Sequence, residues 1–102
     1  MSMVPKRWKS EGSGKNWDGL GSCGDNVVIE DGVRIFYPEN VFIGNNVWIG
    51  WNVTILKGVC LEDNIVVAAG SVVLSGHYPA NSMLAGNPAK IIKKIGADVI
   101  VK

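Results

Sequence analysis

The feature that most constrains the fold of this chain is a six-residue period that runs from Ile43 to Val73. Divided into sixes, the segment reads IGNNVW, IGWNVT, ILKGVC, LEDNIV and VAAGSV. A large aliphatic residue occupies the first place of every six, and another occupies the fifth place in all but the last. A self-similar repeat of fixed period is typical of a solenoid, in which each coil packs only against its neighbours.

This period fits neither an α-helix nor a single strand, because helices space apolar residues three and four apart and half-buried strands alternate. It fits a short strand, a corner and another short strand, with glycine, asparagine and aspartate at corners that need positive φ angles. Three such sides make a triangular coil of eighteen residues, joined to the next coil by a parallel ladder. The pairs expected to stack are Ile43 on Leu61, Ile49 on Val67, Ile55 on Val73 and Val47 on Ile65.

The repeat begins earlier, because Cys23, Ile29 and Ile35 also fall at first places. Eight residues separate Ile35 from Ile43, so two extra residues should bulge out within 36–40, where Pro38 cannot donate to a ladder. Cys23 is then a small core residue. The prediction is an all-β parallel β-helix of about three triangular coils. Three coils are near the minimum for a stable repeat protein, so we expect oligomerisation to stabilise the fold.

The flanks divide the chain into three parts. Residues 1–22 form a Gly/Ser/Lys-rich irregular arm, whose Trp8 and Trp17 would dock on the solenoid or on a neighbouring subunit. Residues 23–79 form the β-helix, and the repeat decays after Val73. Residues 80–102 should cap the open end with a short helix or strand. Pro88 suits the first position of such a helix, and 99–101 would add a short strand.

Composition excludes several function classes. The formal net charge of +1 gives no reason to expect a nucleic-acid partner. No apolar run is long enough to cross a bilayer and no signal peptide is evident, so the expected location is the cytoplasm. The two cysteines have neither metal-ligand nor redox spacing, and no metal site is expected.

Three blocks carry a resemblance to a known family. They are Ile43 to Gly50 (IGNNVWIG), Ala68 to Val73 (AAGSVV) and Ala85 to Ile95 (AGNPAKIIKKI). With the period, they resemble the hexapeptide-repeat acyltransferases, which include maltose, galactoside and xenobiotic O-acetyltransferases. The resemblance implies a left-handed parallel β-helix. The left hand follows from the resemblance alone, because connections between parallel strands are in general right-handed.

The resemblance also implies a homotrimer with acetyl-CoA, or another acyl-CoA, in the groove between subunits. The acceptor would be a sugar or a similar small molecule with a hydroxyl or amine, and no metal takes part. In relatives the Ala-Gly-Ser turn contacts the pantetheine arm, and basic residues after Asn-Pro-Ala meet the nucleotide phosphates. The positions implied for cofactor binding are Ala69, Gly70, Ser71, Asn87, Pro88, Lys90 and Lys93. Relatives commonly carry Thr-Lys-Asp after the Ser-Val-Val turn, where this chain has LSGH.

The chain lacks the histidine that family members use as general base upstream of the Trp-Ile-Gly block. Its single histidine, His77, lies downstream, and Tyr37 and Glu39 are the titratable side chains on the upstream bulge. These three are the candidate catalytic residues. The simpler interpretations are that His77 is an exposed turn residue, and that Tyr37 and Glu39 belong to a bulge whose backbone hydrogen bonds are satisfied locally. A tyrosine is a poor base near neutral pH, because its reference pKa is about 10.

Trp48 and Trp51 fall at outward places, which indicates a subunit interface or, for Trp51, an acceptor pocket. The lysines after Pro88 either contact phosphate or form a solvated face. Two functions remain open: an acyl-CoA-dependent acyltransferase, and a non-catalytic trimeric scaffold that has lost the base. A β-helical carbonic anhydrase would need several zinc-binding histidines, and a single histidine cannot supply them.

Overall fold

A computed structural model describes residues 8–9 and 19–96 of the chain, and these residues form strands with one short 3₁₀ helix. The strands are β1 (Trp8–Lys9), β2 (Ser22–Cys23), β3 (Val27–Ile29), β4 (Arg34–Ile35), β5 (Phe42–Ile43), β6 (Val47–Ile49), β7 (Thr54–Ile55), β8 (Val59–Leu61), β9 (Ile65–Val67), β10 (Val72–Val73), β11 (Gly76–Tyr78), β12 (Ser82–Gly86) and β13 (Ala89–Lys94). The 3₁₀ helix η1 spans Pro38–Asn40. None of the helices in the described part is long and apolar enough to cross a membrane.

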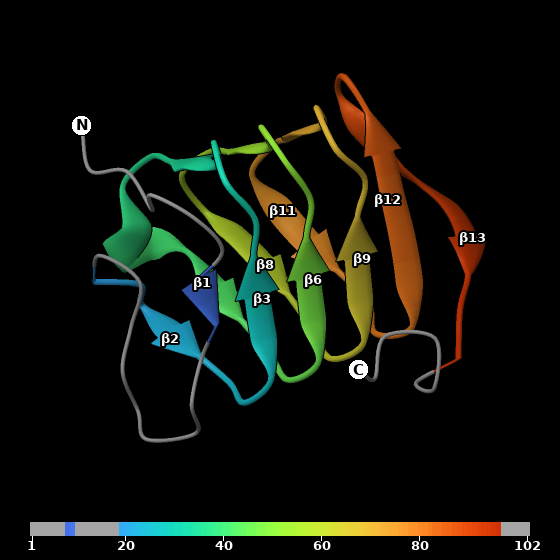
Figure 1. The fold of residues 1–102 in the computed structure, drawn as a ribbon, viewed down its shortest axis with the longest axis horizontal. Coiled ribbons are helices and arrows are strands. Elements are labelled where there is room, and N and C mark those ends of the chain that lie inside the picture. The colour runs from blue at the N-terminus through green and yellow to red at the C-terminus, as the bar shows by residue number, and fades with distance from the viewer. Residues whose placement is uncertain (1–7, 10–18, 97–102) are drawn as a thin grey trace.

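The strands wind into a triangular parallel β-helix with one sheet on each side (Figure 1). We call them sheet A (β1-β3-β6-β9-β12-β13), sheet B (β11-β8-β5-β2) and sheet C (β10-β7-β4). Each coil takes one strand from sheet B, then one from A, then one from C. Three coils are complete, and β11 and β12 add two sides of a fourth. The predicted parallel β-helix is confirmed, and it runs further toward the C-terminus than the sequence pattern indicates.

The strand register confirms the predicted stacking of the core. The register joins Ile43 to Leu61, Ile49 to Val67, Ile55 to Val73 and Val47 to Ile65. These eight side chains are at most 2% exposed. Cys23 aligns with Ile43 and packs against the core as a half-buried residue, as expected. The core is therefore a stack of aliphatic layers, one per coil on each side.

The two extra residues between Ile35 and Ile43 form the predicted bulge. Tyr37 takes a left-handed conformation with φ 55°, and η1 follows it. The turn closes locally, because the Val41 N–H donates to the Pro38 carbonyl over 3.0 Å. The proline lies outside the sheets, so the ladder loses nothing by its missing N–H.

An asparagine ladder marks the corner between sheets B and A. Asn26, Asn46, Asn64 and Asn81 all have φ between 57° and 63°. Their side-chain amides join neighbouring coils, with donor–acceptor distances of 2.8, 3.1 and 2.9 Å along the stack. Asparagine suits this corner because its short amide lowers the cost of the left-handed conformation.

The C-terminal segment corrects one prediction. Residues 89–94 form strand β13, antiparallel to β12, and not the expected helix opened by Pro88. Gly86, with φ 107°, begins the turn that reverses the chain, and β13 pairs with the free edge of β12. The alternative of a strand is thus the correct one. The first strand of the expected cap, β12, is itself a rung of the helix and pairs in parallel with β9.

The fourth coil is hidden in the sequence because its inward residues break the aliphatic pattern. Ser82 takes the place of Ile65 in the stack and is fully buried. Its hydroxyl donates to the Pro79 carbonyl over 2.9 Å, which satisfies the buried polar group. The next inward residue, Leu84, aligns with Val67 seventeen positions earlier, one short of the eighteen-residue period.

The N-terminal arm is described only in part. Strand β1 pairs antiparallel with β3, so the prediction of irregular structure is wrong for these two residues. Their backbone docks on the first coil and covers the edge of sheet A. Trp17 and the strand expected at 99–101 lie outside the described residues.

Candidate functional site

A shallow apolar groove lies where the outer face of sheet A meets the corner toward sheet C. Trp48 of β6 and Val66 of β9 are register partners that point outward, since the residues on either side of each are buried. The corner residues Gly50, Trp51, Ala68 and Ala69 complete the wall. The groove has a volume of about 200 Å³. The structure therefore brings both predicted tryptophans together with the predicted cofactor turn.

Glycine at position 50 lets the two corners approach. A Cβ at Gly50 would lie 2.9 Å from the Ala69 nitrogen and 3.0 Å from the Val67 carbonyl oxygen. The Gly70 N–H donates to the Trp51 carbonyl over 2.8 Å, which stacks one corner on the other. Trp51 stays 53% exposed, so its ring is available as a groove wall.

Trp48 is held by a carboxylate that the sequence pattern does not identify. Its indole Nε1–H donates to Glu30 Oε2 over 2.9 Å, and Glu30 is 3% exposed. Glu30 follows β3 at the position where Gly50 follows β6. The sequence signal that could have identified Glu30 is a charged residue at the position where later coils have the small residues Gly50 and Ala68. A buried carboxylate with a fixed indole donor gives Trp48 a defined orientation.

The predicted turn of Ala69, Gly70 and Ser71 divides into two parts. Ala69 and Gly70 are exposed, whereas Ser71 is 1% exposed. The Ser71 hydroxyl donates to the Ala68 carbonyl over 2.7 Å and accepts from the Gly86 N–H over 3.2 Å. Ser71 thus ties this turn to the β12–β13 hairpin, and it is the outer part of the turn that a ligand can reach.

The hairpin places two of the predicted basic residues on the outer face of sheet A. Asn87 and Pro88 form its exposed turn. Lys90 is the register partner of Ala85, and Lys93 is the register partner of Met83, which in turn aligns with Val66. Register partners in adjacent strands share a face. Lys93 therefore lies two strand spacings, or about 10 Å, from Val66.

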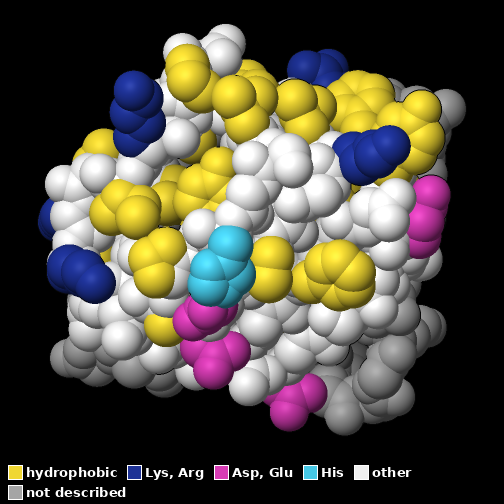
Figure 2. Space-filling view, turned by 180° about the vertical axis from the view of Figure 1, so that it is seen from behind, with side chains coloured by type: hydrophobic (Ala, Val, Ile, Leu, Met, Phe, Trp, Pro, Cys, Tyr) yellow, Lys and Arg dark blue, Asp and Glu magenta, His cyan; other side chains and the backbone are white. Residues whose placement is uncertain are grey.

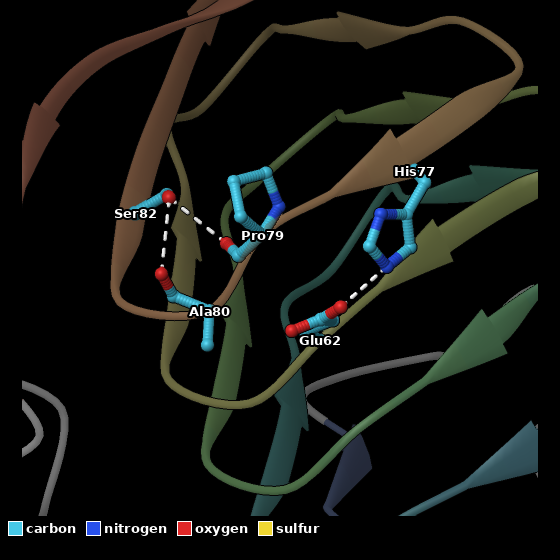
Figure 3. A network of polar contacts seen from close by, with 5 residues as sticks. All are labelled: Glu62, His77, Pro79, Ala80 and Ser82. Atoms are coloured by element: carbon cyan, nitrogen blue, oxygen red, sulfur yellow. Dashed lines mark hydrogen bonds and ion pairs between the residues drawn. The ribbon is translucent and has the colours of Figure 1, made fainter.

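The candidate bases lie elsewhere on the molecule. His77 lies on β11 of sheet B, and its Nε2 contacts the carboxylate of Glu62, the residue that follows β8 (Figure 3). The only histidine is prominent on the face opposite sheet A, with acidic side chains next to it and hydrophobic ones on both sides (Figure 2). Tyr37 and Glu39 are exposed at the corner between sheets C and B, where Lys57 Nζ lies 5.3 Å from the Tyr37 ring centroid.

Within one chain the groove and the candidate bases therefore face different directions. A single chain therefore does not bring the groove and these side chains into one site. No group of three or more potential metal ligands occurs among residues 8–9 and 19–96.

The residues at the groove fit a coenzyme A molecule. An apolar trough suits the methyl and methylene groups of a pantetheine arm, and the exposed turn at Ala69 and Gly70 gives its amides access to backbone groups. Gly70 has φ 75°, and a Cβ there would meet nothing within 4 Å, so the outer side of the turn is open. Lys90 and Lys93 on the same face suit phosphate groups.

Comparisons with known proteins agree with the fold. Residues 40–75 match the family model described as the hexapeptide repeat of succinyl-transferase. A putative acetyltransferase from Saccharomyces cerevisiae is 43% identical over 74 residues, which cover 72% of this chain and 27% of that protein.

Among solved structures, a maltose O-acetyltransferase from Clostridium difficile 630 superposes with a TM-score of 0.65 at 36% identity, over 74% of this chain and 49% of the other. A polysialic acid O-acetyltransferase gives a TM-score of 0.62 at 38% identity, over 72% and 43%. A hexapeptide-repeat acetyltransferase from Vibrio cholerae O1 biovar eltor, solved with acetyl coenzyme A, gives 0.55 at 25% identity, over 72% and 60%.

The protein is thus a left-handed parallel β-helix built from hexapeptide repeats. Residues 40–75 match the hexapeptide-repeat family model, and the proteins to which the chain is similar by sequence and by structure are acetyltransferases. The chain spans about a quarter of the curated relative and about half of the maltose O-acetyltransferase.

Proposed function

We propose that this chain transfers an acyl group, in the first instance acetyl, from acyl-CoA to a hydroxyl or amine of a sugar or similar small acceptor. The observation that carries the proposal is the apolar groove in which Trp48, Trp51 and Ala69 meet beside a hairpin with two outward lysines. The acetyltransferase relatives support the same reaction class.

The groove residues have distinct binding roles in this proposal. Trp48, fixed by Glu30, and Trp51 would pack against the pantetheine arm, and the turn at Ala69 would offer backbone groups to its amides. Lys90 and Lys93 would bind the nucleotide phosphates through charge-assisted hydrogen bonds. Acyl-CoA supplies a thioester, whose carbonyl carbon is the electrophile of the transfer.

His77 is the proposed general base, supplied to the groove by a neighbouring copy in a homotrimer. With Nε2–H donated to Glu62, the neutral imidazole keeps its lone pair on Nδ1, which can accept the acceptor's hydroxyl proton. Glu62 then stabilises the imidazolium that forms. Tyr37 and Glu39 remain candidates on the neighbouring corner, with no partner in the described part of the chain that would orient them as Glu62 orients His77.

Isothermal titration with acetyl-CoA tests the binding half of the proposal. A variant with Lys90→Ala and Lys93→Ala should bind about tenfold more weakly, since each phosphate contact is a charge-assisted hydrogen bond. Lys94→Ala is the matched control, because Lys94 pairs with the inward Ser82 and so faces away from the groove side. Dephospho-CoA lacks the 3′-phosphate but keeps the diphosphate, so it should lose less affinity in the double variant than acetyl-CoA does. No binding of acetyl-CoA by the trimeric wild type would exclude the proposal.

A second function is a trimeric β-helix scaffold without catalysis. The observation that favours it is that the groove and His77 lie on different faces of one chain. A thiol-release assay with acetyl-CoA and a panel of sugars decides between the two. Turnover that disappears in His77→Ala supports the transferase, and acetyl-CoA binding without turnover on any acceptor supports the scaffold.

A further inference from the structure

A row of outward side chains crosses sheet A from the first coil to the lysine-bearing hairpin. The row consists of register partners on β3, β6, β9, β12 and β13, strands that lie side by side in Figure 1: Val28, Trp48, Val66, Met83 and Lys93. Register partners in adjacent strands share a face. Lys93 and Trp48 are therefore three strand spacings, or about 14 Å, apart on this face.

This order sets the direction of a bound acyl-CoA. In the proposed function the nucleotide phosphates contact Lys90 and Lys93, on the last strand of sheet A. The pantetheine arm then runs down the stack past Ala69, because the groove lies over β9 and β6, on the N-terminal side of the hairpin. The acyl group is at the end of the arm that is far from the phosphates, so it lies beside Trp48.

Trp48 offers the acyl group a wall without an available polar group. An indole has a single N–H, and that of Trp48 is donated to Glu30 Oε2 over 2.9 Å. Among residues 8–9 and 19–96, the other side chains that line the groove are aliphatic, apart from the indole of Trp51. An acyl chain that ends in a methyl group therefore leaves no polar group of this wall unsatisfied.

Glu30 places a carboxylate directly behind this wall. Its side chain is 3% exposed, and it reaches Trp48 from the neighbouring coil. Buried charges interact more strongly than exposed ones, because solvent and salt screen them less. An acyl chain that ends in a carboxylate would bring a second charge of the same sign into an apolar groove, where it loses water. The adjacent Asp31 is exposed, so solvent screens its charge.

We propose that Glu30 is a specificity-determining residue, which favours an uncharged alkyl acyl group over one that ends in a carboxylate. Glu30 acts in two ways. Its oxygen holds Trp48 in place as the groove wall, and its charge repels an anionic acyl end. The inference rests on the proposed function, and it narrows the acyl donor to short uncharged groups such as acetyl, propionyl and butyryl.

Butyryl-CoA and succinyl-CoA isolate the effect of the charge. They differ only at the end of the acyl chain, where the methyl group of butyryl is replaced by a carboxylate in succinyl. Isothermal titration of the full chain should give a dissociation constant for succinyl-CoA that is about tenfold or more above that for butyryl-CoA. In Glu30→Gln, which keeps an oxygen acceptor for the indole, this ratio should fall about fivefold, with the affinity for butyryl-CoA unchanged.

Two further variants separate the roles of Glu30. Asp31→Asn is the matched control, because it removes an adjacent but exposed charge, and it should change the ratio by less than about twofold. Glu30→Ala removes both the charge and the indole acceptor, so it should lower the ratio and also weaken butyryl-CoA binding. With all variants folded by circular dichroism, an equal ratio in the wild type and in Glu30→Gln would overturn the proposal. An equal fall in Asp31→Asn would overturn it as well.

A measurement on the wild type tests the placement of the acyl group without any substitution. In heteronuclear NMR spectra, the indole N–H resonance of Trp48 should differ between the complexes with CoA and with butyryl-CoA. The backbone N–H of Gly70, nearer the phosphate end, should give the same resonance in both. Identical Trp48 resonances in the two complexes would overturn the placement and the proposal.

The same titrations distinguish this inference from the proposed function. If butyryl-CoA binds but the ratio is unaltered in Glu30→Gln, the inference fails and the proposed function stands. If neither thioester binds to the wild type, the proposed function fails and the inference fails with it.

Discussion

The asparagine ladder gives the sharpest prediction about stability. Asn46 accepts a hydrogen bond from Asn26 and donates one to Asn64, and its φ is 57°. Asn46→Gly loses both bonds but keeps the left-handed backbone, and at roughly 0.5–1.5 kcal/mol per bond it should lower the unfolding free energy by about 2 kcal/mol. Asn46→Ala loses the same bonds and also pays roughly 1–2 kcal/mol for a left-handed alanine.

Glycine loses more backbone entropy on folding than alanine, by roughly 0.4–1 kcal/mol, which offsets part of that difference. The alanine variant should therefore be less stable than the glycine variant by about 1 kcal/mol. Urea unfolding at one fixed protein concentration measures both, since an oligomer's stability depends on concentration. Asn81→Gly is the control, because Asn81 only accepts one ladder bond and should lose about half as much.

Two outcomes would refute this account of the ladder. If Asn46→Ala equals or exceeds Asn46→Gly in stability, the positive φ is not what selects asparagine at this corner. If Asn81→Gly costs as much as Asn46→Gly, the cost does not follow the number of inter-coil amide bonds.

Three further predictions concern the groove and the core. Gly50→Ala should lower the unfolding free energy measured in urea by about 1–3 kcal/mol, because its Cβ would lie 2.9 Å from the Ala69 nitrogen. It should also weaken acetyl-CoA binding measured by calorimetry. An unchanged unfolding free energy and an unchanged affinity would contradict the close approach. Trp48→Phe removes the indole donor to Glu30 and should lower the unfolding free energy by about 1–3 kcal/mol. The same substitution should cost less in a chain that already carries Glu30→Gln, which buries no charge. Equal costs of Trp48→Phe in the two backgrounds would count against the contact. The pKa of Cys23 rises from 9.0 to about 11 in the folded chain, so the stability it contributes is full below about pH 9 and is lost as the pH rises toward 11. Cys23→Ser should flatten that decline, and an identical pH profile would contradict it.

The sequence predicts the repeat with high fidelity where the period is intact. The stacking of Ile43 on Leu61 and of Ile49 on Val67 follows from the period, because a large aliphatic residue enters the core at every sixth position. The bulge before Val41 follows from a count of residues. These predictions succeed because the constraint is geometric and repeats along the chain.

The fourth coil and the β12–β13 hairpin are not visible in the same way. Ser82 and Leu84 belong to the stack, but a serine replaces an aliphatic residue and one residue is missing from the period. The spacing of Ile91, Ile92 and Ile95 favours a helix locally. The free edge of β12 decides otherwise, because an unpaired strand edge offers hydrogen bonds that only another strand can satisfy.

The candidate site is predicted in part. The outward positions of Trp48 and Trp51 and the exposed turn at Ala69 follow from the pattern and the resemblance. The contacts of Glu30 with Trp48 and of Glu62 with His77 join residues eighteen and fifteen positions apart. They depend on side-chain directions on neighbouring coils, which the register supplies and a linear motif does not.

The most direct test of the central claim is a crystal structure of the full chain with acetyl-CoA bound. We expect a trimer in which the pantetheine arm follows the groove between Trp51 and Ala69, the phosphates contact Lys90 or Lys93, and His77 of a neighbouring copy faces the thioester. Acetyl-CoA bound away from the groove, or a groove covered by the neighbouring copy in the assembled protein, would contradict it.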